Sequence, residues 1–287
     1  MNKMVGRKRI AGLGLVCLLL PAAALPSPRL DLSFKLSGGY SSLALNDVNR
    51  CLRAWVEFHK KDVAANPDWT FSGGKAEKLR GGFDFEGEVL LNLTRRWAVG
   101  IGSGFTFSEV SESRSIITTV ERRAISFAYV RPTKVSAIPV VVSGYFFLPL
   151  GPKVRIYVRA GTGWLWAKYV NREGVRRSTR RDYTYTSFNS VSGRGSLFQE
   201  GLGIKYAHDQ TLGLFFEASL RQAKVNSLKG DNGTLFFYEE YYSLLDFWWP
   251  KTEAMEAAPA GENFRSVRKA VVDFSGFVLK LGFFIKF

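Results

Sequence analysis

The residues with the greatest capacity for chemistry are charged side chains that recur at every second position. Asp84, Glu86 and Glu88 show the pattern most clearly. The full set is Lys35, Asp84, Glu86, Glu88, Arg155, Arg159, Lys205, Glu217, Arg221, Lys280 and Lys286. If one face of a sheet buries them, they must be paired, because an unpaired buried charge costs several kcal/mol. The pattern therefore predicts either a salt-bridged plug or a gate that rearranges to pass water or ions.

Catalysis by an activated hydroxyl needs a base beside a serine, usually with an acidic partner. The chain has two histidines, His59 and His208, and neither has a serine one or two positions away. A partner brought close by folding stays open. Gly100–Gly102 and Gly201–Gly203 read G-x-G, but no helix is expected after either, so nucleotide binding is rejected. We predict no catalytic residue, cofactor or metal.

The segment that holds Lys280 and Lys286 has a period of two. Phe277, Leu279, Leu281, Phe283, Ile285 and Phe287 fall on one face, while the charged and small residues fall on the other. This period is typical of a strand between two environments.

Seven earlier stretches alternate in the same way, although the fourth is apolar on both faces. We expect strands at 31–44, 81–93, 97–108, 135–148, 153–168, 197–206, 212–223 and from about 266 to 287. Three short connections separate them, at 94–96, 149–152 and 207–211, and alternate with long ones at 45–80, 109–134, 169–196 and 224–265. Glu200 falls on the apolar face, which predicts a bulge or a position above the membrane.

The N-terminus and the composition limit the class of protein. Residues 1–24 combine four basic residues, an apolar centre and Ala22-Ala23-Ala24, which indicates a signal peptide cleaved after Ala24. Residues 25–287 then form one domain with Cys51 as its sole cysteine, which excludes an internal disulfide. With 46% hydrophobic and 14% aromatic residues, the chain can bury a core. Outside the N-terminus, no apolar run is long enough for a spanning helix.

The signal peptide, the alternating strands and the terminal Phe287 resemble bacterial outer-membrane β-barrels. In plan the chain is similar to small barrels of the OmpA, OmpX and OmpW kind. The resemblance implies an all-β, eight-stranded antiparallel up-and-down barrel in the outer membrane, with long, partly helical extracellular loops. It also implies that Phe283, Ile285 and Phe287 form an assembly signal. The implied partners are the barrel-assembly machinery, periplasmic chaperones and membrane lipids, above all lipopolysaccharide; we expect a monomer and no nucleic-acid partner.

Two short stretches leave the strand count open. Residues 116–120 and 124–130 also look like strands, but each is too short to cross a membrane. We interpret them as a hairpin above the membrane. The alternative is a barrel with ten strands.

The long connections contain three distinctive segments. In the first, Val48, Cys51, Leu52, Trp55, Val56 and His59 follow a helical spacing. We expect this helix to be capped by Asn46 or Asp47 and to pack on the barrel rim or on other loops. The alternative is a lid, or a helix that lies in the lipid headgroup layer.

The third connection is basic, and Arg172, Arg176, Arg177, Arg180 and Arg181 are its candidate contacts to lipid phosphates, with a merely solvated charge run as the alternative. The fourth holds the aromatic run 235–250, which is expected to fold against the helix or to dip into the membrane interface.

These features predict a membrane protein without catalysis, which acts structurally or binds ligands through its loops. A small gated pore or a transporter of hydrophobic compounds is the first alternative. A lipid A-modifying enzyme is the second.

Overall fold

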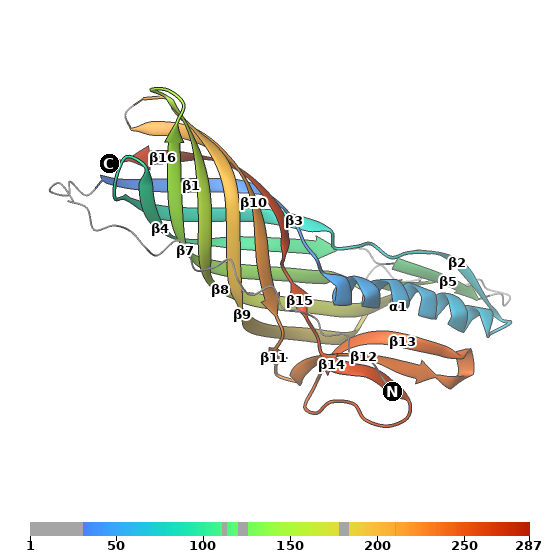
Figure 1. The fold of residues 1–287 in the computed structure, drawn as a ribbon. Coiled ribbons are helices and arrows are strands. Elements are labelled where there is room, and N and C mark those ends of the chain that lie inside the picture. The colour runs from blue at the N-terminus through green and yellow to red at the C-terminus, as the bar shows by residue number, and fades with distance from the viewer. Residues whose placement is uncertain (1–30, 111–113, 120–125, 178–183, 210) are drawn as a thin grey trace, which may run out of the picture.

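The computed structural model describes residues 31–110, 114–119, 126–177, 184–209 and 211–287, and shows a closed barrel with a folded body at one end (Figure 1). The predicted signal peptide, residues 1–24, lies outside the described residues. The barrel strands are β1 (Asp31–Ser42), β3 (Gly81–Asn92), β4 (Trp97–Val110), β7 (Thr133–Pro149), β8 (Val154–Arg177), β9 (Thr184–Ala207), β10 (Leu212–Val225) and β16 (Gly276–Lys286).

Each barrel strand pairs antiparallel with the barrel strand that follows it in the sequence, and the first strand, β1, pairs with the last, β16, to close the ring. The offset of the ring can be found by starting at Tyr40 and moving from each residue to its paired residue on the next strand. One direction around the ring reaches Ser192 on β9, and the other direction reaches Leu202 on the same strand. The ring therefore closes with an offset of ten residues, and such an offset requires tilted strands. The eight-stranded prediction is confirmed.

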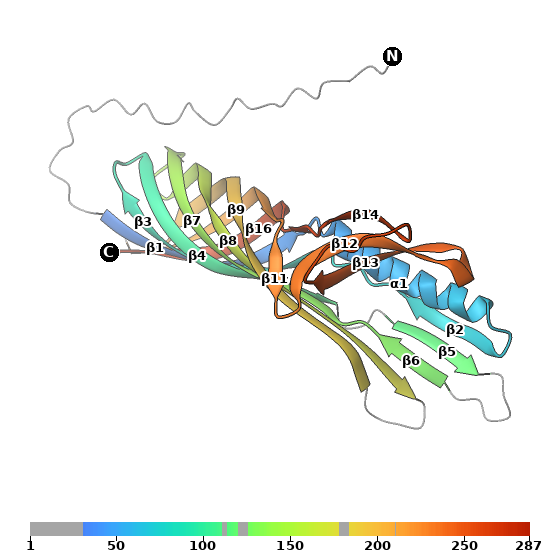
Figure 2. The same cartoon turned by 90° about the horizontal axis from the view of Figure 1, so that it is seen from below.

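The body at the long-loop end is built from all four long connections, and we call it the loop body. Its elements are α1 (Asn46–Ala64), β2 (Trp69–Lys75), β5 (Arg114–Thr119), β6 (Ser126–Val130), β11 (Leu228–Gly230), β12 (Gly233–Tyr242), the short 3-10 helix Ser243–Leu245, β13 (Phe247–Met255), β14 (Phe264–Lys269) and β15 (Val272–Asp273). Helix α1 lies between β2 and β5 on one side and the β12–β14 strands on the other (Figures 1 and 2).

The structure shows whether the two short stretches, 116–120 and 124–130, belong to the barrel or to a hairpin above it. β5 pairs with β6, while β5 also pairs with β2 and β6 with the far end of β8. Neither strand joins the closed ring, so both belong to the loop body, as the hairpin interpretation required.

Several predicted boundaries are wrong. The connection 169–196 is not a loop over most of its described length, because β8 and β9 continue as paired strands well beyond the barrel. The connection 224–265 is largely strands, and the last barrel strand begins at Gly276. Leu45 precedes α1 without a side-chain cap, so neither Asn46 nor Asp47 is the cap. The Asp47 carboxylate binds Arg268 instead.

The barrel wall separates two environments. Outward side chains are apolar and exposed, with Leu281 at 65% and Ile101 at 59%. Glu200 is an exposed exception, and because the β9 register runs unbroken past it, the bulge is excluded as one of the two predicted explanations.

Inward glycines make room for larger neighbours. A Cβ on Gly100 would lie 2.4 Å from the Glu88 carboxylate, and one on Gly203 would lie 2.2 Å from the Tyr157 ring.

Candidate functional site

The middle of the lumen holds a buried charge network centred on Arg159. Its Nη1 lies 3.1 Å from Glu217 Oε1, and its Nη2 lies 2.5 Å from Glu86 Oε1 and 3.5 Å from Glu88 Oε2. Lys35 Nζ lies 2.6 Å from Glu217 Oε2 and 3.8 Å from Glu88 Oε2. Two cations thus contact three carboxylates from β3 and β10, which leaves one negative charge to be balanced.

Lys280 and Arg221 extend the network toward the loop body. Lys280 bonds to Glu86 and lies 3.1 Å from Asp84 Oδ1. Arg221 Nη1 lies 2.6 Å from Asp84 Oδ2, and its Nε donates to the Phe274 carbonyl at 3.1 Å. The network as a whole contains four carboxylates and four cations, all of them buried. This balance makes so many buried charges tolerable.

Neutral hydroxyls complete the network. Tyr145 donates to Glu88, and Tyr157 donates to Glu217 Oε2 at 2.9 Å. Thr106 donates to Asp84 Oδ2 at 2.6 Å, and Ser143 accepts from Arg159 Nε at 3.1 Å. The charge pattern in the sequence does not single out these four residues. Their inward position in the alternation was the available signal, but hydroxyl partners cannot be assigned without the register.

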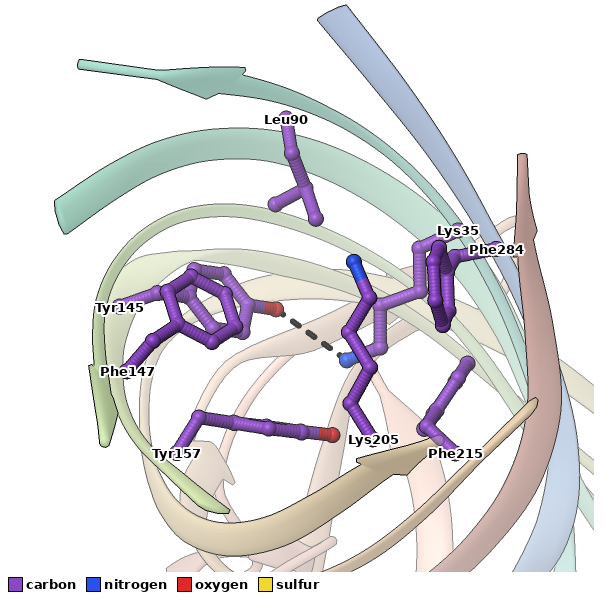
Figure 3. Close-up of a pocket in the computed structure, with 8 residues that line it drawn as sticks. All are labelled: Lys35, Leu90, Tyr145, Phe147, Tyr157, Lys205, Phe215 and Phe284. Carbon is purple, nitrogen blue, oxygen red and sulfur yellow. Dashed lines mark hydrogen bonds between the residues drawn. The ribbon is translucent and has the colours of Figure 1, made fainter. Parts of the chain in front are cut away.

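The lumen is closed on the short-turn side of this network. Phe147, Phe215, Phe284, Tyr145 and Tyr157 form an apolar layer with Leu90 and Ala98. Lys35 and Lys205 extend among these rings, with Lys205 Nζ 3.2 Å from the Phe284 ring centroid (Figure 3). The cavity between them measures about 10 Å³, about enough for one water.

The lumen is also filled on the loop-body side. Val141, Leu165 and Leu197 of the wall belong to one continuous buried cluster with Leu52 of α1 and Phe237 of β12. Leu45, at the start of α1, and Phe274, just before β16, are fully buried in the same cluster. The upper lumen is therefore a packed core shared with the loop body.

Three predicted luminal charges lie near the short-turn rim and outside the central network. Arg155 is exposed, and Lys286 pairs with Asp31 at 2.7 Å. Lys205 faces the aromatic cavity, and none of the described carboxylates forms an ion pair with it. The other predicted luminal residues, including Lys35, are in the network.

Neither histidine is hydrogen-bonded to a serine of the described residues. His59 Nδ1 lies 3.0 Å from the Trp55 carbonyl, and His208 Nδ1 lies 3.2 Å from Asp209 Oδ2 in an exposed turn. Among the described residues there is no group of three or more metal-binding side chains. Within the same residues, no helix is long and apolar enough to cross a membrane.

The predicted phosphate contacts are dispersed along the far end of β8. Arg172 is exposed, with its guanidinium 5.0 Å from the Phe188 ring centroid. Arg176 is half-buried, and Arg177 is the last residue of β8. Arg180 and Arg181 lie outside the described residues.

The predicted assembly signal occupies the end of β16. Phe283 and Ile285 are paired between β1 and β10, with Phe283 43% exposed. Phe287, at 80%, is the most exposed of the large apolar side chains described.

The outward face decides what kind of barrel this is. Apolar side chains line the outer wall on all eight strands, including Leu36, Phe85, Val99 and Val142. Water would disfavour so large an exposed apolar surface, whereas a bilayer solvates it, and a closed barrel leaves no unpaired edge. The chain therefore forms a closed β-barrel that spans a bilayer.

Comparison with solved structures gives low similarity over most of the barrel's length. The outer-membrane protein OprG from Pseudomonas aeruginosa is 13% identical, with a TM-score of 0.38, covering 90% of this chain and 97% of that one. Ail of Yersinia pestis, solved with the heparin analogue sucrose octasulfate, is 12% identical, with a TM-score of 0.36, covering 90% and 100%. The outer-membrane protease OmpT from Escherichia coli is 9% identical, with a TM-score of 0.32, covering 90% and 95%.

No protein-family model matches the sequence, and no curated protein matches it.

Proposed function

We propose that this barrel is a sealed anchor in the outer membrane, and that its loop body is a rigid surface-binding module. The observation that carries the proposal is the continuous buried cluster that joins the upper lumen to α1 and β12. A conducting channel needs a water-filled path, whereas apolar side chains occupy the lumen here. The paired charges below this cluster hold opposite walls together.

The loop body is tied together by bonds between segments far apart in sequence. Trp55 Nε1 donates to Glu173 Oε1 at 3.1 Å, which joins α1 to β8. Arg268 Nη1 and Nη2 donate to Asp47 Oδ2 and Oδ1 at 2.7 and 2.5 Å, which joins β14 to α1. Such a body can present a fixed surface, and less ordering entropy is then lost on binding.

The aromatic segment offers the most suitable contact surface on this body. It packs beside α1, which was one of its two expected positions. The ring of Phe58 on α1 stacks on the ring of Trp249, with 4.0 Å between the ring centroids. Arg265 lies 4.0 Å from the Trp248 ring centroid, and Tyr242 is 36% exposed. Trp, Tyr and Arg are the residues enriched at binding hot spots.

Conductance tests the sealed-anchor part of the proposal. The refolded chain in planar bilayers should give no unitary conductance at either polarity. A known porin, refolded in the same way, serves as the positive control. Reproducible single-channel steps from the wild-type protein would contradict the sealed lumen and favour a pore.

Adhesion tests the surface-binding part. Adhesion is measured on a panel of immobilised glycans and extracellular-matrix proteins. Cells that display the chain should adhere to at least one member of the panel more strongly than cells without the chain. A Tyr242→Ser, Trp248→Ser variant should lose this binding, whereas the control Lys75→Ser, Lys78→Ser on the opposite side of α1 should keep it. Equal adhesion by cells with and without the chain would count against the binding role.

A further inference from the structure

The outer wall changes from apolar to basic along β8 and β9. Toward the short-turn end, outward residues include Val158 on β8 and Leu202 on β9, which are 47% and 58% exposed. Further along β8, Trp164 and Trp166 are exposed by 59% and 47% on the same face. Tryptophan is favoured at the boundary between hydrocarbon and headgroups. The next outward residue, Lys168, therefore stands at headgroup level.

The register brings three cations together at this level. Lys168 on β8 is opposite Ser192 on β9, and Ser192 is opposite Lys229 on β11. Arg194 is two residues from Ser192 on the same face and is opposite Trp166. Directly opposed Cβ atoms lie about 5 Å apart, and diagonal neighbours about 7–8 Å apart. The long side chains of Lys168, Arg194 and Lys229 can therefore converge over the small Ser192.

No described carboxylate forms an ion pair with any of these three cations. Other exposed lysines at this end of the barrel do have partners. Lys224 lies 3.5 Å from Asp273, and Lys134 lies 3.5 Å from Glu109. Clustered like charges repel one another, so an anion that entered the cluster would relieve that repulsion.

We propose that Lys168, Arg194 and Lys229 form a binding site for the phosphate of an anionic membrane lipid. Arg194 supplies a fork that can bind two phosphate oxygens, and the lysines add compact charges. The apolar wall below, including Trp164, then packs along the acyl chains of the same lipid. This site lies where the barrel strands β8 and β9 meet β11 of the loop body, and it is separate from the arginines at the far end of β8.

Lipid binding by the refolded full-length protein tests the site. The protein in detergent is mixed with phosphorylated lipid A or with its dephosphorylated form, and the bound lipid is counted by native mass spectrometry. The test variant is Lys168→Gln, Arg194→Gln, Lys229→Gln. The matched control is Arg95→Gln, Arg96→Gln, Lys153→Gln, which removes three exposed cations at the short-turn end. Heat-modifiable migration establishes that each variant is folded.

We expect the test variant to lose phosphorylated lipid A binding by about tenfold or more, because each charge-assisted hydrogen bond contributes a factor of about that size. The control should bind as the wild type does, and excess inorganic phosphate should compete only weakly, since it has no acyl chains. Equal binding by wild type and folded test variant overturns the site. Equal binding of phosphorylated and dephosphorylated lipid overturns the phosphate assignment, and full competition by inorganic phosphate overturns the lipid assignment.

Discussion

Arg159 Nη1 and Glu217 Oε1 lie 3.1 Å apart, and both side chains are fully buried in the lumen. The same guanidinium contacts Glu86 and Glu88, so Arg159 links β8 to both β3 and β10. Its role should therefore be visible in the barrel's unfolding.

Arg159→Met should destabilise the barrel by about 3–5 kcal/mol, because it leaves carboxylates buried without their main cation. Urea unfolding in micelles, followed by gel migration, measures the change. The control Lys134→Gln breaks an exposed pair with Glu109 and should cost less than about 1 kcal/mol. An equal effect of the two variants would argue against a structural luminal network.

Trp55 of α1 is a fully buried side chain of the loop body, at 0% exposure. Trp55→Ala should destabilise that body by about 3–5 kcal/mol through the cavity it leaves. Limited proteolysis from the outer side should then cut the loop body while the barrel keeps its heat-modifiable migration. Glu57→Ala, at an exposed position on the same helix, should leave the cleavage rate unchanged.

His59 should make the loop body sensitive to acid. Burial lowers the pKa of His59 below 6.5, although Glu173 and Asp62 act in the opposite direction. The Arg131 charge also lowers this pKa, and the Tyr129 ring lies 4.6 Å from the imidazole. Because the unfolded segment binds a proton more readily, stability is lost as the pH falls from about 6.5 through the lowered pKa.

Proteolysis of the loop body as a function of pH tests this dependence. Wild-type cleavage should accelerate between neutral pH and about pH 5, within the range where histidine titrates. His59→Gln should flatten that part of the profile, whereas His208→Gln, in an exposed turn, should not. Identical profiles for wild type and His59→Gln would exclude His59 as the source.

Ser103 lies next to a short interruption in the pairing of β4 with β7 and donates a hydrogen bond across it. The β4–β7 ladder has no pairing at Gly104 and Phe105, where β7 carries Ile138 and Pro139. Ser103 Oγ donates to the Pro139 carbonyl at 3.0 Å, which satisfies one backbone group at the break. Ser103→Ala should therefore cost about 1 kcal/mol in urea unfolding. Ser196→Ala, at another exposed serine of the wall, is the control; an equal cost at both positions would refute the supporting role.

The sequence by itself determined the barrel and much of what faces its lumen. A period of two places alternate residues on opposite faces, so Asp84, Glu86 and Glu88 could be assigned inward before any partner was known. The helical spacing around Trp55 predicted α1 for the same kind of reason, since local backbone geometry fixes which side chains share a face.

Only the tertiary structure decided which of these residues meet. Lys35 and Glu217 are 182 positions apart, and the tilt and offset of the closed ring set their common height. The same offset places Lys205 beside the aromatic side chains near the short-turn end of the lumen, and therefore outside the charge network.

The sequence predicted α1 and one hairpin of the loop body, but not how the body assembles, because its strands are stabilised by contacts between all four long connections. β5 is paired by β2 and β6, and β12 by β13 and β14. Such short strands have little stability alone, so their existence depends on partners that the local pattern does not reveal.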